Sequence, residues 1–585
     1  MTTRRGFLAW CAGTVASARA AAQTRIPAAD GGVSDAGGPD LFAGAPAPDD
    51  PLEFLYSRRL AFDGGQPLVT VRVAEGKREA VVLPRGPLQA DARAQSGAPE
   101  RAVSDGIEGR WSVRLADGRP GVGAAWVELE EIRYGDKEGL ARARETWSSR
   151  GVTTRVTTVG QVYGIAGHVV DTRKYAVLAE GDATEAGAQA QASQLTARFE
   201  GVRPQILREM ASRPSGRIEL VDPDGKVRAV GHGAIELRAR GGIAVPDVEF
   251  GMGYAFHGYE SRTYPGRLYG AVDAAGTLAL VAGVPMERLV KGVVPSEIFA
   301  NAHREALKGQ AVTARGEVLA KVGARHLGDP YLLCAEQHCQ VYRGASAETA
   351  ATDRAVDDTR GEALFARVPA RGVIGEKAKG RVSRLVDSVY SAVCGGFTEN
   401  NDAVWGGPPD PSLRGRPDFD PRSPAMARFA DGIGAALVSS FVHLRKVQSY
   451  CALSGLARPE KVRWTRTFTQ AEVDELCAPL KVGKVRALAV EGRGISGRAR
   501  ALRVEGSAGV ARVVSELAIR RLFRNLNSGM FVIERPGGDF AFVGGGWGHG
   551  SGMCQLGAIG RAQQGWDYRR ILGWYYSGAR PERIY

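Results

Sequence analysis

The stretch from Leu289 to Arg315, LVKGVVPSEIFANAHREALKGQAVTAR, sets an apolar run beside a helical pattern. The run Leu289–Val294 is rich in valine and typical of a short strand, which Pro295 is expected to end because proline cannot donate a ladder hydrogen bond. Apolar residues then recur at helical spacing, which predicts a helix over 302–321 with Asn301 as its N-cap. The stretch therefore predicts a strand, a connection and a helix.

Glu297 falls in that connection, where a rigid scaffold commonly presents functional side chains. Two interpretations of this carboxylate are open. Burial among apolar neighbours such as Phe299 would keep it protonated near neutral pH, as a general acid requires. Alternatively, Glu297 only caps the helix or pairs with Lys291 or Arg304.

Length and charge restrict the class of protein. A chain of 585 residues is too long for one hydrophobic core and predicts about three or four domains. The formal net charge of +13 is spread along the chain, without a cluster of Lys and Arg interleaved with aromatic residues, so we expect no nucleic-acid partner. A diffuse positive charge suits an anionic polymer of the cell envelope. After the N-terminus no segment approaches the roughly 20 apolar residues of a membrane helix, so we expect no transmembrane segment.

The N-terminus predicts export. Thr3–Leu8 contains twin arginines, and a weakly apolar run and the small residues Ala16–Ala22 follow, which is typical of a twin-arginine signal peptide over 1–22. Residues 23–50 are rich in Ala, Gly, Pro and Asp and predict a disordered linker. The protein is therefore expected in the periplasm or cell envelope.

Beyond the linker, the patterns predict a β-rich α+β fold with several domains. Short β-forming runs separated by Gly- and Asp-rich turns predict a β-rich region over 51–120. A strand–helix alternation predicts an α+β module over 121–205, and residues 215–585 carry the densest motifs. The elements expected in the module are strands at Trp126–Tyr134, Thr153–Val159 and His168–Val170 and helices at Lys137–Ser149 and Ala183–Phe199.

Six cysteines follow the predicted signal peptide. An even number in an oxidising compartment permits disulfides, and Cys451 with Cys477 is the pair that we favour.

A second group of candidate ligands lies in one loop. His326, Cys334, His338 and Cys339 fall within fourteen residues and offer the nitrogen and sulfur donors of tetrahedral zinc, although their spacing is not a standard zinc-finger repeat. A disulfide between Cys334 and Cys339 fits the same loop outside the cytoplasm. We favour the disulfide and keep structural zinc as the alternative.

Five sequence blocks together resemble the SpoIID/LytB domain family, which is known from a sporulation peptidoglycan lytic transglycosylase and from an amidase enhancer. The blocks occur in the family's order and are too many to match by chance. They are Val294–Glu297 followed by Glu305–Arg315, Cys339–Gly344, Cys394–Glu399, Gly494–Arg498 and Gly546–Ala558.

The resemblance implies a function for Glu297. In the family's enzymes the glutamate of this VPSE motif is the catalytic acid. A lytic transglycosylase needs only one carboxylate, because the muramyl 6-hydroxyl attacks C1 internally. The resemblance thus implies an exported enzyme that cleaves MurNAc–GlcNAc strands to 1,6-anhydro products and requires no cofactor. The alternative is a non-catalytic amidase enhancer or glycan-binding protein, with a cell-wall amidase as its partner.

The matched blocks also supply binding candidates. The glycine-rich run 544–552 lacks the Gly-Lys-Ser/Thr of a phosphate loop, and its glycines suggest a close backbone approach instead. Glu399 is the reserve carboxylate if hydrolysis needs a second one. Some family members bind zinc near Cys334, His338 and Cys339, with His326 the least certain match. The expected substrate-binding residues are Lys308, Gln310, Arg315, Gln340, Tyr342, Thr398, Glu399, His549 and Gln555.

A second resemblance concerns the α+β module. Trp147–Gly151 followed by Val162–Gly167 loosely resembles the SPOR domain, a small ferredoxin-like module that binds peptidoglycan glycan strands. The resemblance implies a preference for denuded glycans. A structural insert without a ligand fits the same pattern, because ferredoxin-like folds host many functions.

Overall fold

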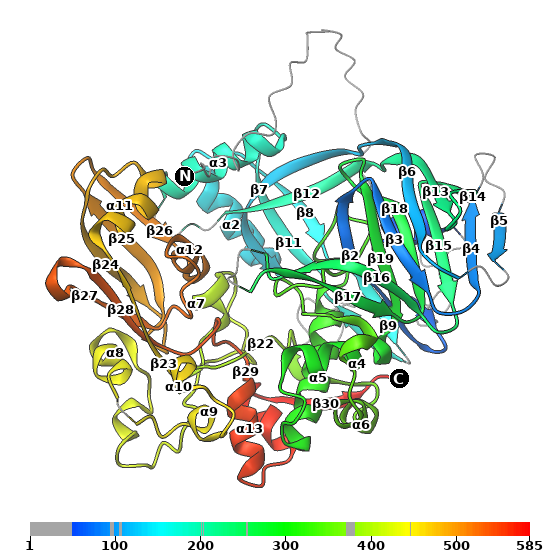
Figure 1. Cartoon of the computed structure of the whole chain (residues 1–585). Helices are drawn as coiled ribbons and strands as arrows, with labels where there is room; N and C mark the ends of the chain where they lie inside the picture. Colours follow the sequence, from blue (N-terminus) through cyan, green and yellow to red (C-terminus); the bar gives the residue numbers. More distant parts are fainter. Residues whose placement is uncertain are drawn as a thin grey trace. The chain divides into compact units, whose positions relative to one another are not determined.

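The computed structural model describes residues 50–585 except 94–98, 105–107, 166, 200–201, 203, 253–255, 370–380 and 445 (Figure 1). The predicted signal peptide, and the linker up to residue 49, lie outside the described residues. The described residues are β-rich with helices and contain several distinct sheets. None of the helices described is long and apolar enough to cross a membrane.

Two antiparallel sheets are built from two segments that are far apart in sequence. The seven-stranded sheet has the order β1-β2-β19-β18-β15-β4-β5, and the six-stranded sheet has the order β14-β13-β6-β3-β16-β17. The β-rich region predicted at 51–120 thus shares both sheets with the strands of 215–285. The elements are α1 (Pro51–Tyr56), β1 (Ala61–Asp63), β2 (Gln66–Lys77), β3 (Glu79–Pro84), β4 (Leu88–Arg93), β5 (Pro99–Ser104), β6 (Trp111–Arg119), β13 (Ser215–Val221), β14 (Val227–His232), β15 (Ala234–Ala239), β16 (Ile243–Phe250), β17 (Gly258–Tyr264), β18 (Arg267–Val272) and β19 (Leu278–Pro285).

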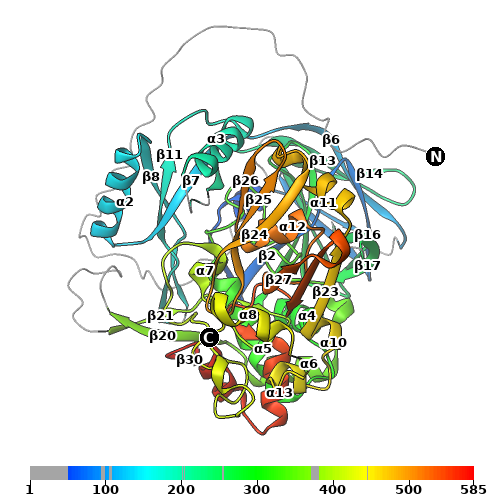
Figure 2. The ribbon, with the colours of Figure 1, turned by 90° about the vertical axis from the view of Figure 1, so that its left-hand side faces the viewer.

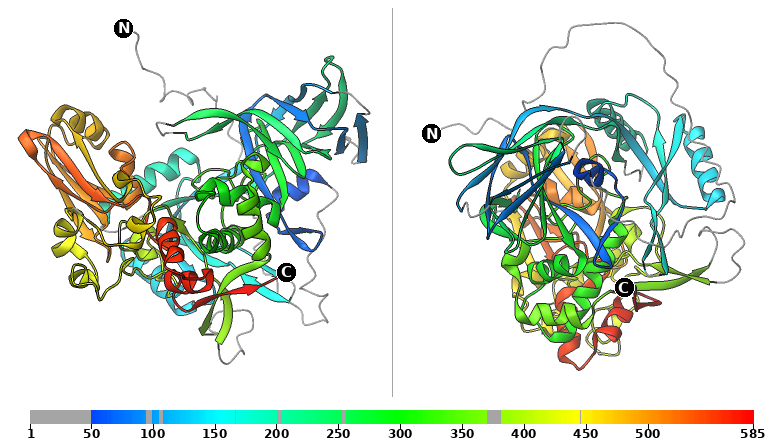
Figure 3. Two further views of the ribbon diagram at one scale, coloured as in Figure 1. Left: turned by 60° about the horizontal axis from the view of Figure 1, so that its bottom comes forward. Right: turned by 90° about the vertical axis from the view of Figure 1, so that its right-hand side faces the viewer.

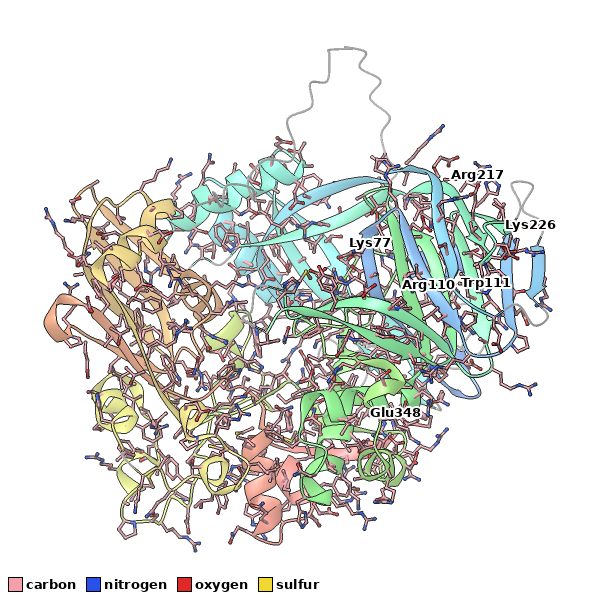
Figure 4. The ribbon with its side chains drawn as sticks, in the orientation of Figure 1. Lys77, Arg110, Trp111, Arg217, Lys226 and Glu348 are labelled. Atoms are coloured by element: carbon pink, nitrogen blue, oxygen red, sulfur yellow. The ribbon has the colours of Figure 1, made fainter. Side chains whose placement is uncertain are left out.

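The two sheets pack closely face to face. Side chains from both sheets, such as Val113 and Ile218 from one and Ile235 from the other, share one hydrophobic core. Gly270 on β18 is needed for this approach, since a Cβ there would lie 2.5 Å from Val113 Cγ1. Figure 4 labels Trp111, which is fully buried at the start of β6.

Between these segments lies the α+β module. The strands of its sheet and its two helices follow in the order strand, helix, strand, strand, helix, strand, with a separate hairpin inserted between the second and third of these strands. Its four-stranded sheet has the order β12-β7-β11-β8, and both helices pack on one face of it (Figure 2). The helix predicted at Lys137–Ser149 is confirmed, and the one predicted from Ala183 begins at Glu185. The elements are β7 (Val122–Arg133), α2 (Lys137–Ser149), β8 (Thr154–Val159), β9 (Val162–Ile165), β10 (His168–Asp171), β11 (Lys174–Ala179), α3 (Glu185–Arg198) and β12 (Gln205–Ser212).

The strand predicted at His168–Val170 exists, but it does not belong to this sheet. It is β10, which forms a separate hairpin with β9. The strand that completes the sheet is β11, which pairs with both β7 and β8 and was not predicted. The hairpin instead contacts the following region, where the Tyr163 hydroxyl donates to the Leu319 carbonyl.

The strand predicted at Leu289–Val294 is wrong. Met286–Glu297 is a single helix, α4, and Pro295 lies inside its last turn. The buried apolar residues follow i, i+3, i+4, i+7 spacing, so a helix places all of them against the core, whereas a strand would alternate them between two faces. Pro295 removes one hydrogen bond near an end where the helix stops two residues later.

The second predicted helix is confirmed as α5 (Arg304–Lys321). Its N-cap is His303 rather than Asn301, because the first helical residue is Arg304 and the imidazole Nδ1 accepts a hydrogen bond from the Glu305 amide. Both α4 and α5 contribute buried faces to the main hydrophobic core.

The C-terminal part contains three small three-stranded sheets and several short helices. Helix α13 packs against α5, and the C-terminal strand β30 pairs with β20 (Figure 3). The elements are α6 (Ala350–Asp358), β20 (Glu362–Pro369), β21 (Arg381–Leu385), β22 (Tyr390–Ser391), α7 (Asn401–Trp405), α8 (Gly434–Val442), α9 (Tyr450–Leu453), α10 (Pro459–Val462), β23 (Arg463–Phe468), α11 (Gln470–Cys477), β24 (Val485–Arg493), β25 (Ala499–Gly506), β26 (Val510–Val514), α12 (Glu516–Leu522), β27 (Phe531–Glu534), β28 (Phe540–Gly545), β29 (Met553–Cys554), α13 (Gln555–Gln563), α14 (Tyr568–Tyr575) and β30 (Ala579–Arg583).

A short parallel pair joins distant parts of the chain. In it, Tyr390 of β22 lies opposite Met553 of β29, and Ser391 lies opposite Cys554. This pairing brings the segment before the Cys394 block beside the glycine-rich C-terminal block, next to the start of α13.

Candidate functional site

Glu297 is the last residue of α4, and the residue as a whole is partly exposed. The backbone N–H of Val341 donates to Glu297 Oε1 over 2.6 Å. The Gln555 side-chain amide, at the start of α13, donates to the backbone carbonyl of Glu297 over 3.0 Å. Two segments from distant parts of the chain thus hold the end of α4 in place at Glu297.

The surroundings keep Glu297 protonated near neutrality. Burial raises the pKa of Glu297 to about 7, and the nearby Glu317 carboxylate also raises it. The Val341 N–H and the Lys321 ammonium act in the opposite direction and lower the pKa. Burial prevails because it disfavours the charged form. A carboxyl group with this pKa can donate a proton at neutral pH and take one back afterwards.

A network of amides and a phenol surrounds the carboxyl group. Gln555 Nε2 donates to Gln310 Oε1 over 3.1 Å, and the Tyr390 hydroxyl donates to Gln340 Oε1 over 2.9 Å. The three glutamines are buried, while Tyr390 is partly exposed. The structure therefore brings Gln310, Gln340 and Gln555 together beside Glu297, and their role as substrate-binding residues stays a prediction. Tyr390 was missed because it lies four residues before the Cys394 block.

Two exposed aromatic side chains, Phe299 and Trp405, are candidates for contact with a sugar. Phe299, two residues beyond Glu297, is 48% exposed, so it does not bury the carboxyl group as expected. Trp405 is 41% exposed, and its ring centroid lies 4.9 Å from that of His549. Exposed aromatic faces of this kind can stack on sugar rings.

His549 is held by backbone groups on both ring nitrogens. Nε2 donates to the Tyr390 carbonyl over 2.8 Å, and Nδ1 accepts from the Ser551 N–H over 3.1 Å. Burial, with a further contribution from Arg498, lowers the pKa of His549 to about 3. The imidazole is therefore neutral and both nitrogens are occupied, so it fixes the glycine-rich turn and leaves no ring nitrogen for a sugar hydroxyl.

Arg315 and Lys308 do not belong to this cluster. Arg315 is fully buried and donates to both carboxylate oxygens of Glu287, at 2.8 and 2.6 Å. Lys308 pairs with Glu305 at 3.2 Å and Asp358 at 3.7 Å. Their charges are compensated within the fold, and the prediction that Arg315 contacts substrate is wrong because its guanidinium is out of reach.

Glu399 is not an available second carboxylate. It is 1% exposed, and its oxygens accept hydrogen bonds from the Ile495 and Ser496 amides and from Ser496 Oγ. Thr398 exchanges hydrogen bonds with the Arg416 backbone and is 2% exposed, and Tyr342 is 1% exposed in the core. These three residues support the loops around the site, and their side chains do not reach its surface.

The predicted Cys/His loop forms a compact donor set. One ligand atom from each of His326, Cys334, His338 and Cys339 lies within 4.8 Å of the others. His338 Nδ1 is 3.7 Å from each sulfur, and His326 Nε2 is 3.4 Å from Cys339 Sγ. His326 Nδ1 contacts Asp329 Oδ2 at 2.9 Å, the carboxylate–imidazole arrangement common behind a metal-bound histidine. Two thiols and two imidazoles in this geometry fit tetrahedral zinc.

All six cysteines in the described part of the chain are free. Neither predicted disulfide is formed, because Cys334 and Cys339 are both free, and so are Cys451 and Cys477. Cys477 ends α11 and packs in a core with Phe468 and Val473, whereas Cys451 Sγ lies 3.9 Å from Cys394 Sγ. Sequence spacing could not show this, because the two cysteines belong to different hydrophobic cores.

Comparison with known proteins agrees with this geometry. Residues 274–365 match the family model SpoIID, described as Stage II sporulation protein, and residues 399–552 match a domain of unknown function, DUF8618. The first match contains Glu297, the Cys/His loop and two of the glutamines. The chain therefore carries a domain of the SpoIID family, as the sequence blocks predicted.

Curated relatives are similar at low identity. Stage II sporulation protein D of Bacillus subtilis is 26% identical over 51% of this chain and 75% of its own length. The amidase enhancer of the same organism is 26% identical over 49% of this chain but only 39% of its own length. An uncharacterized protein of Brachyspira hyodysenteriae is 26% identical over 52% of this chain and 68% of its own length.

Proposed function

We propose that this protein is a peptidoglycan-remodelling lytic transglycosylase of the cell envelope, with Glu297 as its acid and base. The observation that carries the proposal is Glu297 itself, a partly exposed residue whose pKa is raised to about 7 by burial of its carboxyl group. Two exposed aromatic side chains accompany it: Phe299 follows two residues later, and Trp405 packs on His549, whose ring binds the Tyr390 carbonyl. The SpoIID family match and the relative named Stage II sporulation protein D support a role on the cell wall.

The proposed reaction uses one carboxyl group twice. Protonated Glu297 donates its proton to the glycosidic oxygen as the bond from C1 of MurNAc to O4 of GlcNAc breaks. The C6 hydroxyl of the same MurNAc then attacks C1, and the Glu297 carboxylate accepts its proton. The products are a 1,6-anhydro end and a free 4-hydroxyl, and Glu297 is protonated again. The carboxylate oxygens of Glu399 accept hydrogen bonds from Ile495 and Ser496, so Glu399 cannot serve as a second catalytic carboxylate. A mechanism with one carboxyl group therefore fits this site better than hydrolysis by two.

The alternative function is that of a non-catalytic amidase enhancer, which the relative of that name supports. The experiment that separates the two is incubation of the purified chain with glycan strands, with and without stem peptides, and with and without a cell-wall amidase. Cleavage by the chain alone supports the enzyme. Saturable binding without cleavage, together with faster amide hydrolysis when the amidase is added, supports the enhancer.

The α+β module supports glycan binding in the same proposal. Apart from the β9–β10 hairpin, its βαββαβ order and its sheet order β12-β7-β11-β8 support the proposal of a ferredoxin-like module, the class to which SPOR domains belong. We infer that it binds denuded strands, so strands without stem peptides are expected to bind more tightly. Equal affinity for both kinds of strand would contradict this role.

Cleavage should depend on pH through Glu297. The rate is expected to fall about tenfold per unit as pH rises above about 7, because only the protonated acid can donate. Glu317→Gln removes a carboxylate that raises the pKa of Glu297, so the alkaline limb should move to lower pH. The measurement is the pH profile of product release, with the exposed Glu460→Gln as control. An unmoved limb in Glu317→Gln would contradict the assignment.

We also propose that His326, Cys334, His338 and Cys339 hold structural zinc. Such an ion would tie the loop together close to the active site, since Cys339 lies two residues before the Val341 N–H that binds Glu297. The Lys321 ammonium also donates to the Cys339 carbonyl over 3.2 Å.

Cys339→Ser is expected to lower the zinc content by one equivalent per chain, because a closed structural site needs all four ligands. Metal analysis of the purified chain measures this, with Cys477→Ser as the matched control that keeps its zinc. Alkylation mass spectrometry that finds Cys334 and Cys339 joined in the native chain would instead establish the disulfide.

A further inference from the structure

A second cluster of candidate ligands lies deep in the C-terminal part. The Sγ atoms of Cys394, Cys451 and Cys554 and a carboxylate oxygen of Asp418 all lie within 4.8 Å of one another. All four side chains are fully buried. They come from four separate segments of the chain, so only the fold brings them together.

The distances fit one tetrahedral ion. Zinc–sulfur bonds of about 2.3 Å and zinc–oxygen bonds of about 2.0–2.2 Å require sulfurs about 3.8 Å apart and sulfur and oxygen about 3.6 Å apart. Cys394 Sγ lies 3.9 Å from Cys451 Sγ and 3.3 Å from Asp418 Oδ2. These two separations are close to the edge lengths of a zinc tetrahedron, and the remaining ones are at most 4.8 Å.

The surroundings are arranged for negatively charged sulfur. The backbone N–H of Gly396 points at Cys394 Sγ over 3.4 Å, and those of Cys394 and Gly557 point at Cys554 Sγ over 3.2 and 3.3 Å. Gly557 lies in the first turn of α13, whose N-terminus favours negative charge. Donors of this kind commonly surround metal-bound thiolates.

Hydrogen bonds also orient the carboxylate of Asp418 toward the cluster. Its Oδ1 accepts hydrogen bonds from the Tyr575 hydroxyl at 2.6 Å and from Arg561 at 3.3 Å. Oδ2 is thereby left facing the sulfurs. Around metal sites, neighbouring side chains commonly hydrogen-bond one oxygen of a ligand carboxylate and so orient the other oxygen toward the ion. The guanidinium of Arg561, 1% exposed, also offsets the negative charge that three thiolates and a carboxylate leave around a divalent ion.

We propose that Cys394, Cys451, Cys554 and Asp418 bind one structural zinc ion. Three soft thiolates and a carboxylate favour zinc over magnesium or calcium, and four protein ligands in a fully buried site leave no open position for catalysis. The bound ion would link the loop that begins at Cys394 to Cys554 at the start of α13. It thereby fixes Gln555, the residue after Cys554, against the Glu297 carbonyl.

This site does not depend on the proposed enzymatic activity, and metal analysis of the full chain tests it. In a Cys334→Ser/Cys339→Ser background, which lacks the thiols of the other cluster, we expect one zinc per chain, with three sulfur neighbours in X-ray absorption. Adding Cys451→Ser should reduce that zinc at least tenfold, whereas adding Cys477→Ser should leave it unchanged. Absence of zinc from the background variant, or its retention after Cys451→Ser, would overturn the proposal.

A measurement on the wild-type chain keeps the test decisive if a variant fails to fold. Because the Cys/His loop is also proposed to hold an ion, the native chain should contain two zinc ions, which a strong chelator releases only on unfolding. After unfolding without reductant, Cys394, Cys451 and Cys554 should all be alkylated. A disulfide between Cys394 and Cys451, recovered with both sulfurs blocked, would overturn the proposal.

Discussion

Glu297→Gln is expected to reduce cleavage of glycan strands by about 10²- to 10⁴-fold, the usual contribution of a general acid or base. Glutamine keeps the shape of the side chain and can still accept the Val341 N–H that now binds Oε1. It cannot donate a proton to the leaving oxygen or take one from the muramyl 6-hydroxyl. The loss should therefore appear in kcat, with affinity for the strand nearly unchanged.

The matched control is Glu460→Gln, which changes an exposed carboxylate in α10 and should leave the rate as it is. Thermal unfolding and strand binding of both variants should match the wild type, which separates lost chemistry from lost structure. If Glu297→Gln cleaved at the wild-type rate, the catalytic assignment would be wrong.

The second large effect concerns stability. Arg315→Met is expected to destabilise the fold by about 3–5 kcal/mol, because it leaves the carboxylate of Glu287 buried without its cationic partner. In the intact protein Arg315 binds both oxygens of Glu287 and also donates to the Val356 carbonyl over 2.9 Å. The Tyr585 hydroxyl, at the C-terminus, donates to the same carboxylate over 2.6 Å. The first urea transition, followed by circular dichroism, measures the loss.

Two further variants test the cause. Glu287→Met/Arg315→Met removes both charges and should be less destabilised than Arg315→Met alone, since replacing a buried pair by apolar side chains is often neutral. Arg422→Met breaks an exposed pair with Asp420 and should have no measurable effect. A double variant as unstable as the single one would show that packing, rather than an unpaired charge, explains the loss.

Local sequence patterns predicted some elements well and others poorly. Helix α5 and the helix Lys137–Ser149 were predicted correctly, because each is long enough for apolar residues to recur several times at helical spacing. The run 289–294 is short and rich in β-branched residues, so its period was ambiguous, and only its packing against the core shows that it is helical. Strand β11 was missed because it is buried and almost entirely apolar, without the alternation of an exposed strand.

The candidate site was predictable only where a motif marks it. Glu297 and the glutamines stand in recognisable blocks, so the sequence named them as candidates, and the structure places them side by side. Tyr390 joins them through a two-residue strand pair with β29, which no local pattern indicates. Arg315 was predicted as a binding residue because no local pattern indicates its partners: Glu287 lies in the first turn of the preceding helix, and Tyr585 is 270 residues further along the chain. The Cys394 cluster likewise draws on four segments that only tertiary structure connects.

The most direct test of the central claim is the chemical identity of the end that the purified protein creates in a glycan strand. Mass spectrometry of the products should find 1,6-anhydro-MurNAc ends, which lack one water relative to hydrolysed ends, because the attacking hydroxyl belongs to the sugar itself. These ends should disappear with Glu297→Gln. Reducing MurNAc ends in their place, or no new ends from protein that binds the strands, would contradict the account.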